Sequence, residues 1–252
     1  MYQLILFALD NLPEVLPGTN LARMILEACR RDSFALETGD IVVITQKIVS
    51  KAEGRLVDLT PVTPGEEALK LAAQCNKDPR LVELILSESR EILRVRPGLI
   101  IPETKHGLVS ANAGIDASNT GDRQTMVLLL PVDPDDSAKL IRQEFYQLSG
   151  VRVAVVVNDS QGRPFRNGAI GIAIGCSGVQ PLKVYVGEKD RDSKTLQSSV
   201  EAVGDEMASA ASLLMGQAAE GRPVVIIRGL SHFAGEGQAT DLVRVPALDM
   251  FR

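Results

Sequence analysis

Short apolar runs separated by helical patterns constrain the fold of this chain more than any other feature. Runs rich in Val, Ile and Leu occupy positions 41–45, 126–130, 151–157 and 223–227, and the apolar N-terminus predicts a first strand. Runs of this length and composition are typical of buried central strands. Because helical patterns alternate with them, we predict an α+β fold with a mixed sheet and packed helices, formed as a single module over residues 1–252.

Helix signals divide the remainder of the chain. Thr63-Pro64, Asp78-Pro79 and Asp133-Pro134 each place proline at an expected helix start. Gly150 permits the left-handed backbone that ends the third of these helices. Apolar faces at helical spacing are expected along the second helix and along a fourth segment. Their members are Val82, Ile85, Leu86 and Leu93, and then Leu196, Val200, Val203, Met207 and Leu214.

Composition argues against several classes of protein. The net charge is −5 and tryptophan is absent, whereas nucleic-acid binding relies on cationic and stacking side chains. No apolar run approaches the roughly 18 residues that span a bilayer, and the N-terminus lacks the pattern of a signal peptide. Cys29, Cys75 and Cys176 lie far apart, which fits a reducing cytoplasm better than a disulfide framework or a zinc site. We expect a cytoplasmic protein with no nucleic-acid or membrane partner.

Four polar, glycine-containing segments lie at the ends of apolar runs, where rigid scaffolds often present functional groups. Residues 45–54 follow a strand, and their Lys47 and Lys51 could contact phosphate; a solvated basic turn is the alternative. Residues 213–223 lie between a helix and a strand. Taken alone, they indicate a glycine-terminated helix and its loop.

The other two segments contain carboxylates. Asp116 lies within residues 112–119 among amides, a hydroxyl and small residues, a set of oxygens that suits a hard cation such as Mg²⁺; a capping turn is the alternative. Asp159 directly follows the apolar run 151–157, where a strand would deliver it as a metal ligand. Arg163 and Arg166 come next and could hold an anion through two hydrogen bonds; a turn with a surface ion pair is the alternative.

Several common catalytic motifs are missing from the sequence. It contains no GxxxxGK[ST] loop, no GxGxxG after a strand and no GxSxG, which argues against P-loop, Rossmann and α/β-hydrolase sites. His106 and His232 form no recognisable triad or zinc motif.

Six strings in the sequence together resemble the coenzyme F420-0:γ-glutamyl ligase family. They are Leu12–Glu14, Ser50–Gly54, Asn112–Asn119, Asp159–Arg166, Ala173–Gly178 and Leu214–Gly216. They occur in the family's order and cover the chain from about residue 12 to residue 229. The resemblance implies GTP-dependent addition of L-glutamate to F420-0, or to its dehydro form, by way of an acyl phosphate, with further γ-linked glutamates as an extension. It also implies two divalent cations (Mg²⁺ or Mn²⁺), K⁺ as a further ion, GDP and phosphate as products, and an intertwined homodimer.

The resemblance implies roles for individual residues. Asp116, Asp159 and Lys51 would be catalytic; Asp116 and Asp159 would bind one divalent cation, and Ser160 and Gln217 a second. The residues implied to contact GTP are Leu12, Pro13, Glu14, Val15, Gln46, Lys47, Lys51, Asn119, Met215, Gly216, Gln217, Ala218, Ala219, Glu220, Gly221 and Arg222.

Two positions depart from the family's pattern. Ser160 replaces the more usual Thr but keeps the hydroxyl, and Gln217 stands where some relatives have an acidic residue. An amide oxygen is a weaker cation ligand than a carboxylate. Two other functions are alternatives: a non-catalytic nucleotide-binding homologue, and a ligase for a different carboxylate acceptor. Paired metal carboxylates argue against the first, and the absent P-loop argues against a common folate-type enzyme.

Overall fold

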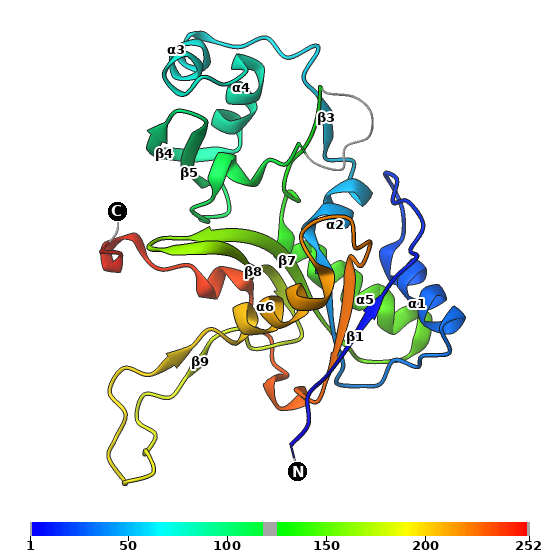
Figure 1. The fold of residues 1–252 in the computed structure, drawn as a ribbon. Helices are drawn as coiled ribbons and strands as arrows, with labels where there is room; N and C mark the ends of the chain where they lie inside the picture. Colours follow the sequence, from blue (N-terminus) through cyan, green and yellow to red (C-terminus); the bar gives the residue numbers. More distant parts are fainter. Residues whose placement is uncertain (1, 118–124, 251–252) are drawn as a thin grey trace.

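A five-stranded mixed sheet forms the centre of the computed structural model, which describes residues 2–117 and 125–250 (Figure 1). The strand order is β1-β11-β2-β7-β8; β2 and β7 pair in parallel, and the other neighbours pair antiparallel. The predicted mixed sheet is therefore confirmed. Its strands are β1 (Ile5–Leu9), β11 (Val224–Arg228), β2 (Ile41–Thr45), β7 (Ala154–Arg163) and β8 (Arg166–Ser177).

The apolar runs lack alternation because both faces of the sheet are covered. In β2, Val42 and Ile44 belong to the core cluster that includes α1 and α5, while Ile41 and Val43 belong to the cluster beneath α6. A strand buried on both faces gains from an apolar side chain at every position. The covering helices are α1 (Leu21–Arg31), α5 (Pro134–Ser149) and α6 (Val203–Met215).

A second group of elements lies above the sheet in Figure 1 and has a core cluster of its own. The predicted strand at 126–130 belongs to this part: β6 is limited to Met126–Leu128 and pairs with β3 (Leu56–Asp58), outside the central sheet. Leu129 and Leu130 are buried although they lie outside the strand. Their apolar side chains therefore indicated burial correctly but did not indicate where the strand ends. The other elements here are α3 (Glu66–Cys75), α4 (Pro79–Ser87), β4 (Ser89–Arg96), β5 (Leu99–Thr104) and the 3₁₀ turn η1 (Ala111–Gly114).

Some predicted helix ends are confirmed and others are wrong. The Asp78 carboxylate caps α4 by accepting from the Arg80 N–H, and Gly150 ends α5 with φ of 72°. α3 begins after Gly65 with no side-chain cap, so the start predicted at Thr63 is wrong.

The two predicted apolar helix faces are too long. Leu93 lies in β4, Val200 lies in β10 (Val200–Glu201), and Leu196 lies in a turn. A few apolar residues match helical and strand spacing equally well, and tertiary packing decided between them. Val203 and Met207 do form the buried face of α6.

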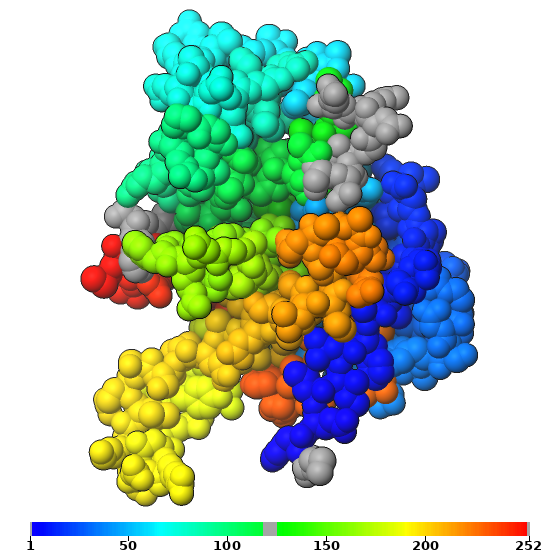
Figure 2. Space-filling model, in the orientation of Figure 1, coloured from blue at the N-terminus to red at the C-terminus, as the bar shows by residue number. Residues whose placement is uncertain are grey.

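A hairpin arm and the C-terminal segment complete the chain. The arm contains β9 (Lys183–Val184) and β10 and extends away from the body of the molecule (Figures 1 and 2). Three short 3₁₀ turns follow β11: η2 (Ser231–Phe233), η3 (Ala239–Leu242) and η4 (Pro246–Leu248). Within the described residues, no helix is long and apolar enough to cross a membrane.

Candidate functional site

The lysines of the first polar segment lie on a helix, so the alternative of a solvated basic turn is wrong. α2 (Gln46–Ala52) begins directly where β2 ends. Gln46 is buried, and its Oε1 accepts a hydrogen bond from the Ser50 hydroxyl at 2.9 Å. Lys47 and Lys51 are four residues apart, so they share one face of this helix. A rigid element therefore presents both ammonium groups in the same direction.

Each lysine forms an ion pair with a carboxylate from a distant part of the sequence. Lys47 Nζ lies 2.7 Å from Asp116 Oδ2, and Lys51 Nζ lies 3.2 Å from Glu14 Oε1. Glu14 is largely exposed, whereas Asp116 is mostly covered. The Lys47–Asp116 ion pair thus joins the polar segment 45–54 to the polar segment 112–119. No spacing in the sequence indicates this contact.

An unusual backbone turn delivers Asp116 to this position. Asn112 and Ala113 both adopt left-handed backbone angles within η1, and Gly114 has φ of 70°. A side chain at Gly114 would meet the Leu130 side chain at about 3 Å, so glycine is required there for close packing as well. Asp116 then pairs with Leu128 of β6 through both backbone hydrogen bonds.

Asp159 lies inside a strand, and the predicted loop after residue 157 is wrong. β7 continues to Arg163 and forms a long antiparallel hairpin with β8, in which Asp159 is opposite Ile172 and Ser160 is opposite Gly171. The strand persists through polar residues because β8 supplies backbone partners beyond the edge of the buried core. Arg163 and Arg166 lie at the hairpin tip, away from the buried sheet.

Asp116, Asp159 and Lys47 form one electrostatic cluster. Burial raises the pKa of Asp159 from 3.8 to about 6. The Ser160 backbone N–H opposes this shift, the Asp116 carboxylate adds to it, and the Lys47 ammonium again opposes it. Two carboxylates with one ammonium leave a net negative charge in a partly buried place, an arrangement that favours binding of a further cation.

The two residues implied to bind a second cation also lie together. Gln217 Nε2 donates to Ser160 Oγ at 2.9 Å. The loop that carries Gln217 starts at Gly216, whose φ is 74° and whose missing side chain leaves space for the Glu220 carboxylate. Glu220 Oε2 accepts from the Ala218 N–H at 2.8 Å, and such backbone hydrogen bonds lower the Glu220 pKa. This loop is held by its own contacts beside the hairpin.

The other residues implied to contact GTP differ in how deeply they are buried. Val15 and Met215 are buried, with Met215 packed in the cluster beneath α6, and Pro13 is exposed. Asn119 lies outside the described residues. Asn158 was not among the predicted site residues, yet it is buried and its Nδ2 donates to Ser212 Oγ at 3.2 Å. The one sequence signal for Asn158 is that it directly precedes Asp159.

The donor atoms of the Asp116–Asp159 pair and of the Ser160–Gln217 pair suit oxygen-ligated divalent cations. Two carboxylates, a hydroxyl and an amide oxygen are ligands that Mg²⁺ and Mn²⁺ accept. Among the described residues, no three His, Cys, Asp or Glu side chains gather as a ready metal site. A cation here would therefore complete its coordination with oxygens from water or from a phosphate ligand, as Mg²⁺ commonly does.

Comparison with known proteins decides the family. Residues 10–229 match the family model described as F420-0:Gamma-glutamyl ligase. The chain belongs to this family. The F420-0:γ-glutamyl ligase match contains the whole cluster of Lys47, Asp116 and Asp159, and it confirms the resemblance seen in the sequence.

Relatives match over almost the whole chain. A protein of Methanothermobacter thermautotrophicus named coenzyme F420:L-glutamate ligase is 45% identical over 249 residues, 98% of both chains. Proteins of the same name from Methanocaldococcus jannaschii and Methanopyrus kandleri are 45% and 46% identical, and they cover 92% and 95% of this chain and 90% and 94% of their own. The family is one of amide-bond-forming ligases.

Proposed function

We propose that this protein joins L-glutamate to F420-0, or to its dehydro form, through an amide bond, with GTP as the phosphoryl donor. A free carboxylate is a poor acyl donor because oxide would have to leave. Transfer of the GTP γ-phosphoryl group to that carboxylate gives an acyl phosphate, and attack by the glutamate amine then releases phosphate. The observation that carries the proposal is the convergence of Lys47, Asp116 and Asp159 in a member of this ligase family.

The cluster suggests a division of roles. When bound, divalent cations would neutralise the phosphate charges and align an in-line attack. Asp116 and Asp159 are proposed to hold one such ion, and Ser160 and Gln217 a second, with K⁺ as a further proposed ion. The Lys47 ammonium, which contacts Asp116 in this structure, would orient that carboxylate and contribute fixed positive charge beside the transferring group.

The nucleotide is proposed to lie along the contact between α2 and residues 12–15. Lys51 and Glu14 bridge these two segments, and the Gly216–Arg222 loop meets the hairpin at Ser160. GTP is expected to support turnover with a kcat/KM far above that of ATP, measured by release of phosphate. Equal values for the two nucleotides would contradict the assignment of GTP.

A homodimer is proposed on the basis of the projecting arm. Val184, Val186 and Val200 are 56%, 51% and 50% exposed, and they lie on or beside the two short strands of an arm that extends from the body (Figure 2). Exposed apolar side chains such as these three are stabilised when a partner covers them. Light scattering at micromolar concentration is expected to give twice the mass of one chain, and an active monomer would contradict the proposal.

The cytoplasm is the proposed compartment. Cys29, Cys75 and Cys176 are all buried as free thiols, which fits a reducing environment.

Mass spectrometry tests the activity directly. The protein is incubated with F420-0, L-glutamate, GTP and Mg²⁺ or Mn²⁺, and the product is expected to carry the added mass of one glutamyl residue or more, with GDP and phosphate released. Binding of GTP without a product would instead support the non-catalytic alternative. A product formed with another carboxylate acceptor, and none with F420-0, would support the second alternative.

A further inference from the structure

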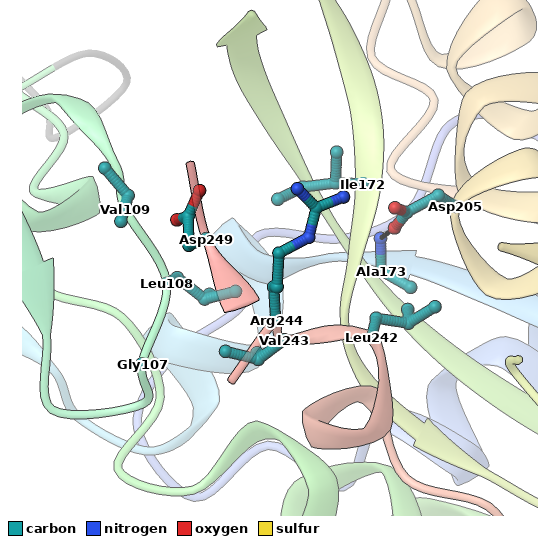
Figure 3. A pocket seen from close by; sticks show the side chains of 10 residues that line it. All are labelled: Gly107, Leu108, Val109, Ile172, Ala173, Asp205, Leu242, Val243, Arg244 and Asp249. Atoms are coloured by element: carbon teal, nitrogen blue, oxygen red, sulfur yellow. Dashed lines mark hydrogen bonds between the residues drawn. The ribbon is translucent and has the colours of Figure 1, made fainter. Parts of the chain in front are cut away.

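A cavity of about 170 Å³ lies on the outer edge of the sheet, close to the carboxylate cluster but separate from it (Figure 3). Ile172 and Ala173 of β8 form its floor, residues 107–109 form one wall, and residues 242–244 with Asp249 form the other. This second wall lies beyond residues 10–229, which match the family model. None of the residues considered for nucleotide or metal lines the cavity.

One cationic side chain enters this cavity. Figure 3 shows the Arg244 guanidinium between the carboxylates of Asp249 and Asp205. Within the described part of the chain, Arg244 takes part in no hydrogen bond or ion pair. A guanidinium presents several N–H donors in a plane that matches a carboxylate, so Arg244 can still accept an anionic group.

An acidic side chain faces Arg244 from α6. Asp205 Oδ1 accepts from the Ala173 N–H at 2.9 Å, which fixes the carboxylate on the edge of β8. Burial raises the pKa of Asp205. Its Oδ2 accepts no hydrogen bond from the described residues, and a partly buried carboxylate of this kind gains from a cationic partner.

These charges select one kind of ligand. A simple anion such as phosphate would meet Arg244 but would be repelled by Asp205 and Asp249, and a metal ion would meet these carboxylates but would be repelled by Arg244. A molecule with a carboxylate at one end and an ammonium nearby satisfies both. Leu108, Val109 and Leu242 supply apolar wall for the methylene groups of such a molecule.

We propose that this cavity is the subsite for L-glutamate, with one carboxylate held by Arg244 and the ammonium held by Asp205 before reaction. The inference rests on the proposed function, because it assigns the amine donor of that reaction. Ile172 is directly opposite Asp159 in the β7–β8 hairpin, and opposite residues of an antiparallel pair share a face at about 5 Å between Cα atoms. The amine donor would thus lie one strand away from the carboxylates that are proposed to hold the metal and phosphates.

Direct binding of L-glutamate is the first measurement. Isothermal titration of L-glutamate into the wild-type protein and into Arg244→Gln is expected to show affinity reduced by about 10- to 100-fold in the variant, the range for a lost hydrogen bond between charged groups. Arg30→Gln is the matched control, because Arg30 is an exposed residue of α1, and it is expected to bind L-glutamate like the wild type. Thermal melts confirm that all three proteins are folded.

A second variant tests the contact with the ammonium. Asp205→Asn keeps an oxygen for the Ala173 N–H but loses the charge, so folding is expected to survive. Glutarate has the same two carboxylates as L-glutamate and lacks the ammonium. The wild type is expected to prefer L-glutamate over glutarate by at least about 10-fold, and Asp205→Asn is expected to lose most of that preference.

Steady-state kinetics separate this inference from the proposed function. In the ligase assay, Arg244→Gln is expected to raise KM for L-glutamate by about 10- to 100-fold while KM for GTP changes less than about 2-fold. If folded Arg244→Gln catalyses ligation with the wild-type KM for L-glutamate, the subsite is overturned and the proposed function still stands. Binding of L-glutamate that depends on Arg244, in a protein that forms no product, would support the subsite and count against the function.

Discussion

Replacement of Asp159 by Asn is expected to stabilise the metal-free protein while abolishing ligation. Asp159→Asn keeps the size of the side chain and an oxygen that can accept from the Ser160 N–H, which is one of the contacts that act on this carboxylate. What it removes is a negative charge that burial and the nearby Asp116 both disfavour. A site built for a cation is strained without one, so stability and activity are expected to change in opposite directions.

The size of the effect follows from the pKa. A change from 3.8 in the unfolded chain to about 6 in the folded protein corresponds to about 3 kcal/mol in the free energy of unfolding. The folded protein binds the proton on Asp159 more tightly, so the contribution of this group to stability is fully present below pH 3.8 and is lost as pH rises through about 6. Asp159→Asn is therefore expected to be more stable than wild type by about 3 kcal/mol near pH 7.5 and by only about 1 kcal/mol near pH 4.5.

Urea denaturation in the presence of EDTA measures this difference at the two pH values. Glu27→Gln serves as the control, because Glu27 is an exposed residue in the middle of α1 and its neutralisation is expected to change stability by less than about 0.5 kcal/mol. Single-turnover amide formation is measured on the same preparations, and a loss of several orders of magnitude is expected for Asp159→Asn. The control is expected to keep wild-type activity.

A structural role for Asp159 would give the reverse pattern. If its carboxylate only stabilised the hairpin, Asp159→Asn would be less stable than wild type by about 1–3 kcal/mol, and residual ligation would follow the folded fraction. That result, or a stability gain that does not depend on pH between about 4.5 and 7.5, would refute the reasoning.

Three further predictions concern neighbouring parts of the structure. Asp116→Asn is expected to lose ligation like Asp159→Asn, and the double variant to be little worse than either, because groups that hold one ion act as a unit; additive losses in single-turnover assays would contradict a shared ion. Gln217→Glu is expected to lower the Mg²⁺ concentration needed for half-maximal activity, because it adds a charge beside Ser160; an unchanged cation dependence would place Gln217 outside the site. Arg228→Met is expected to lower the free energy of unfolding by about 3–5 kcal/mol, because it leaves the buried Asp40 carboxylate without its partner. Arg228 makes two hydrogen bonds of 2.8 and 2.7 Å to that carboxylate, and Asp40 is 1% exposed. A change under about 1 kcal/mol in urea denaturation would show that the pair contributes only as much as a surface ion pair.

Local chemistry determined several elements without help from the rest of the chain. Asp78-Pro79 and Asp133-Pro134 began helices as predicted, because a capping carboxylate and a fixed proline φ act within a few residues. The run at 41–45 formed a buried strand because four apolar residues in succession, followed by Thr45, suit a sheet covered on both faces. The six strings, taken together and in order, were sufficient to indicate the family, because their residue types and sequence can be compared without knowledge of the fold.

Long-range contacts decided what the sequence alone left open. The sequence left Lys47 as either a phosphate contact or part of a solvated turn, whereas α2 directs it to Asp116, which lies far along the chain. Asp159 looked like the start of a loop, yet pairing with β8 keeps it in a strand. The placement of Arg244 opposite Asp205 across a cavity also has no local signal, because it arises when the C-terminal segment packs along the free edge of β8. Backbone propensities and caps act over a few residues and can be read from the sequence, whereas charge clusters and cavities form only when distant segments pack together.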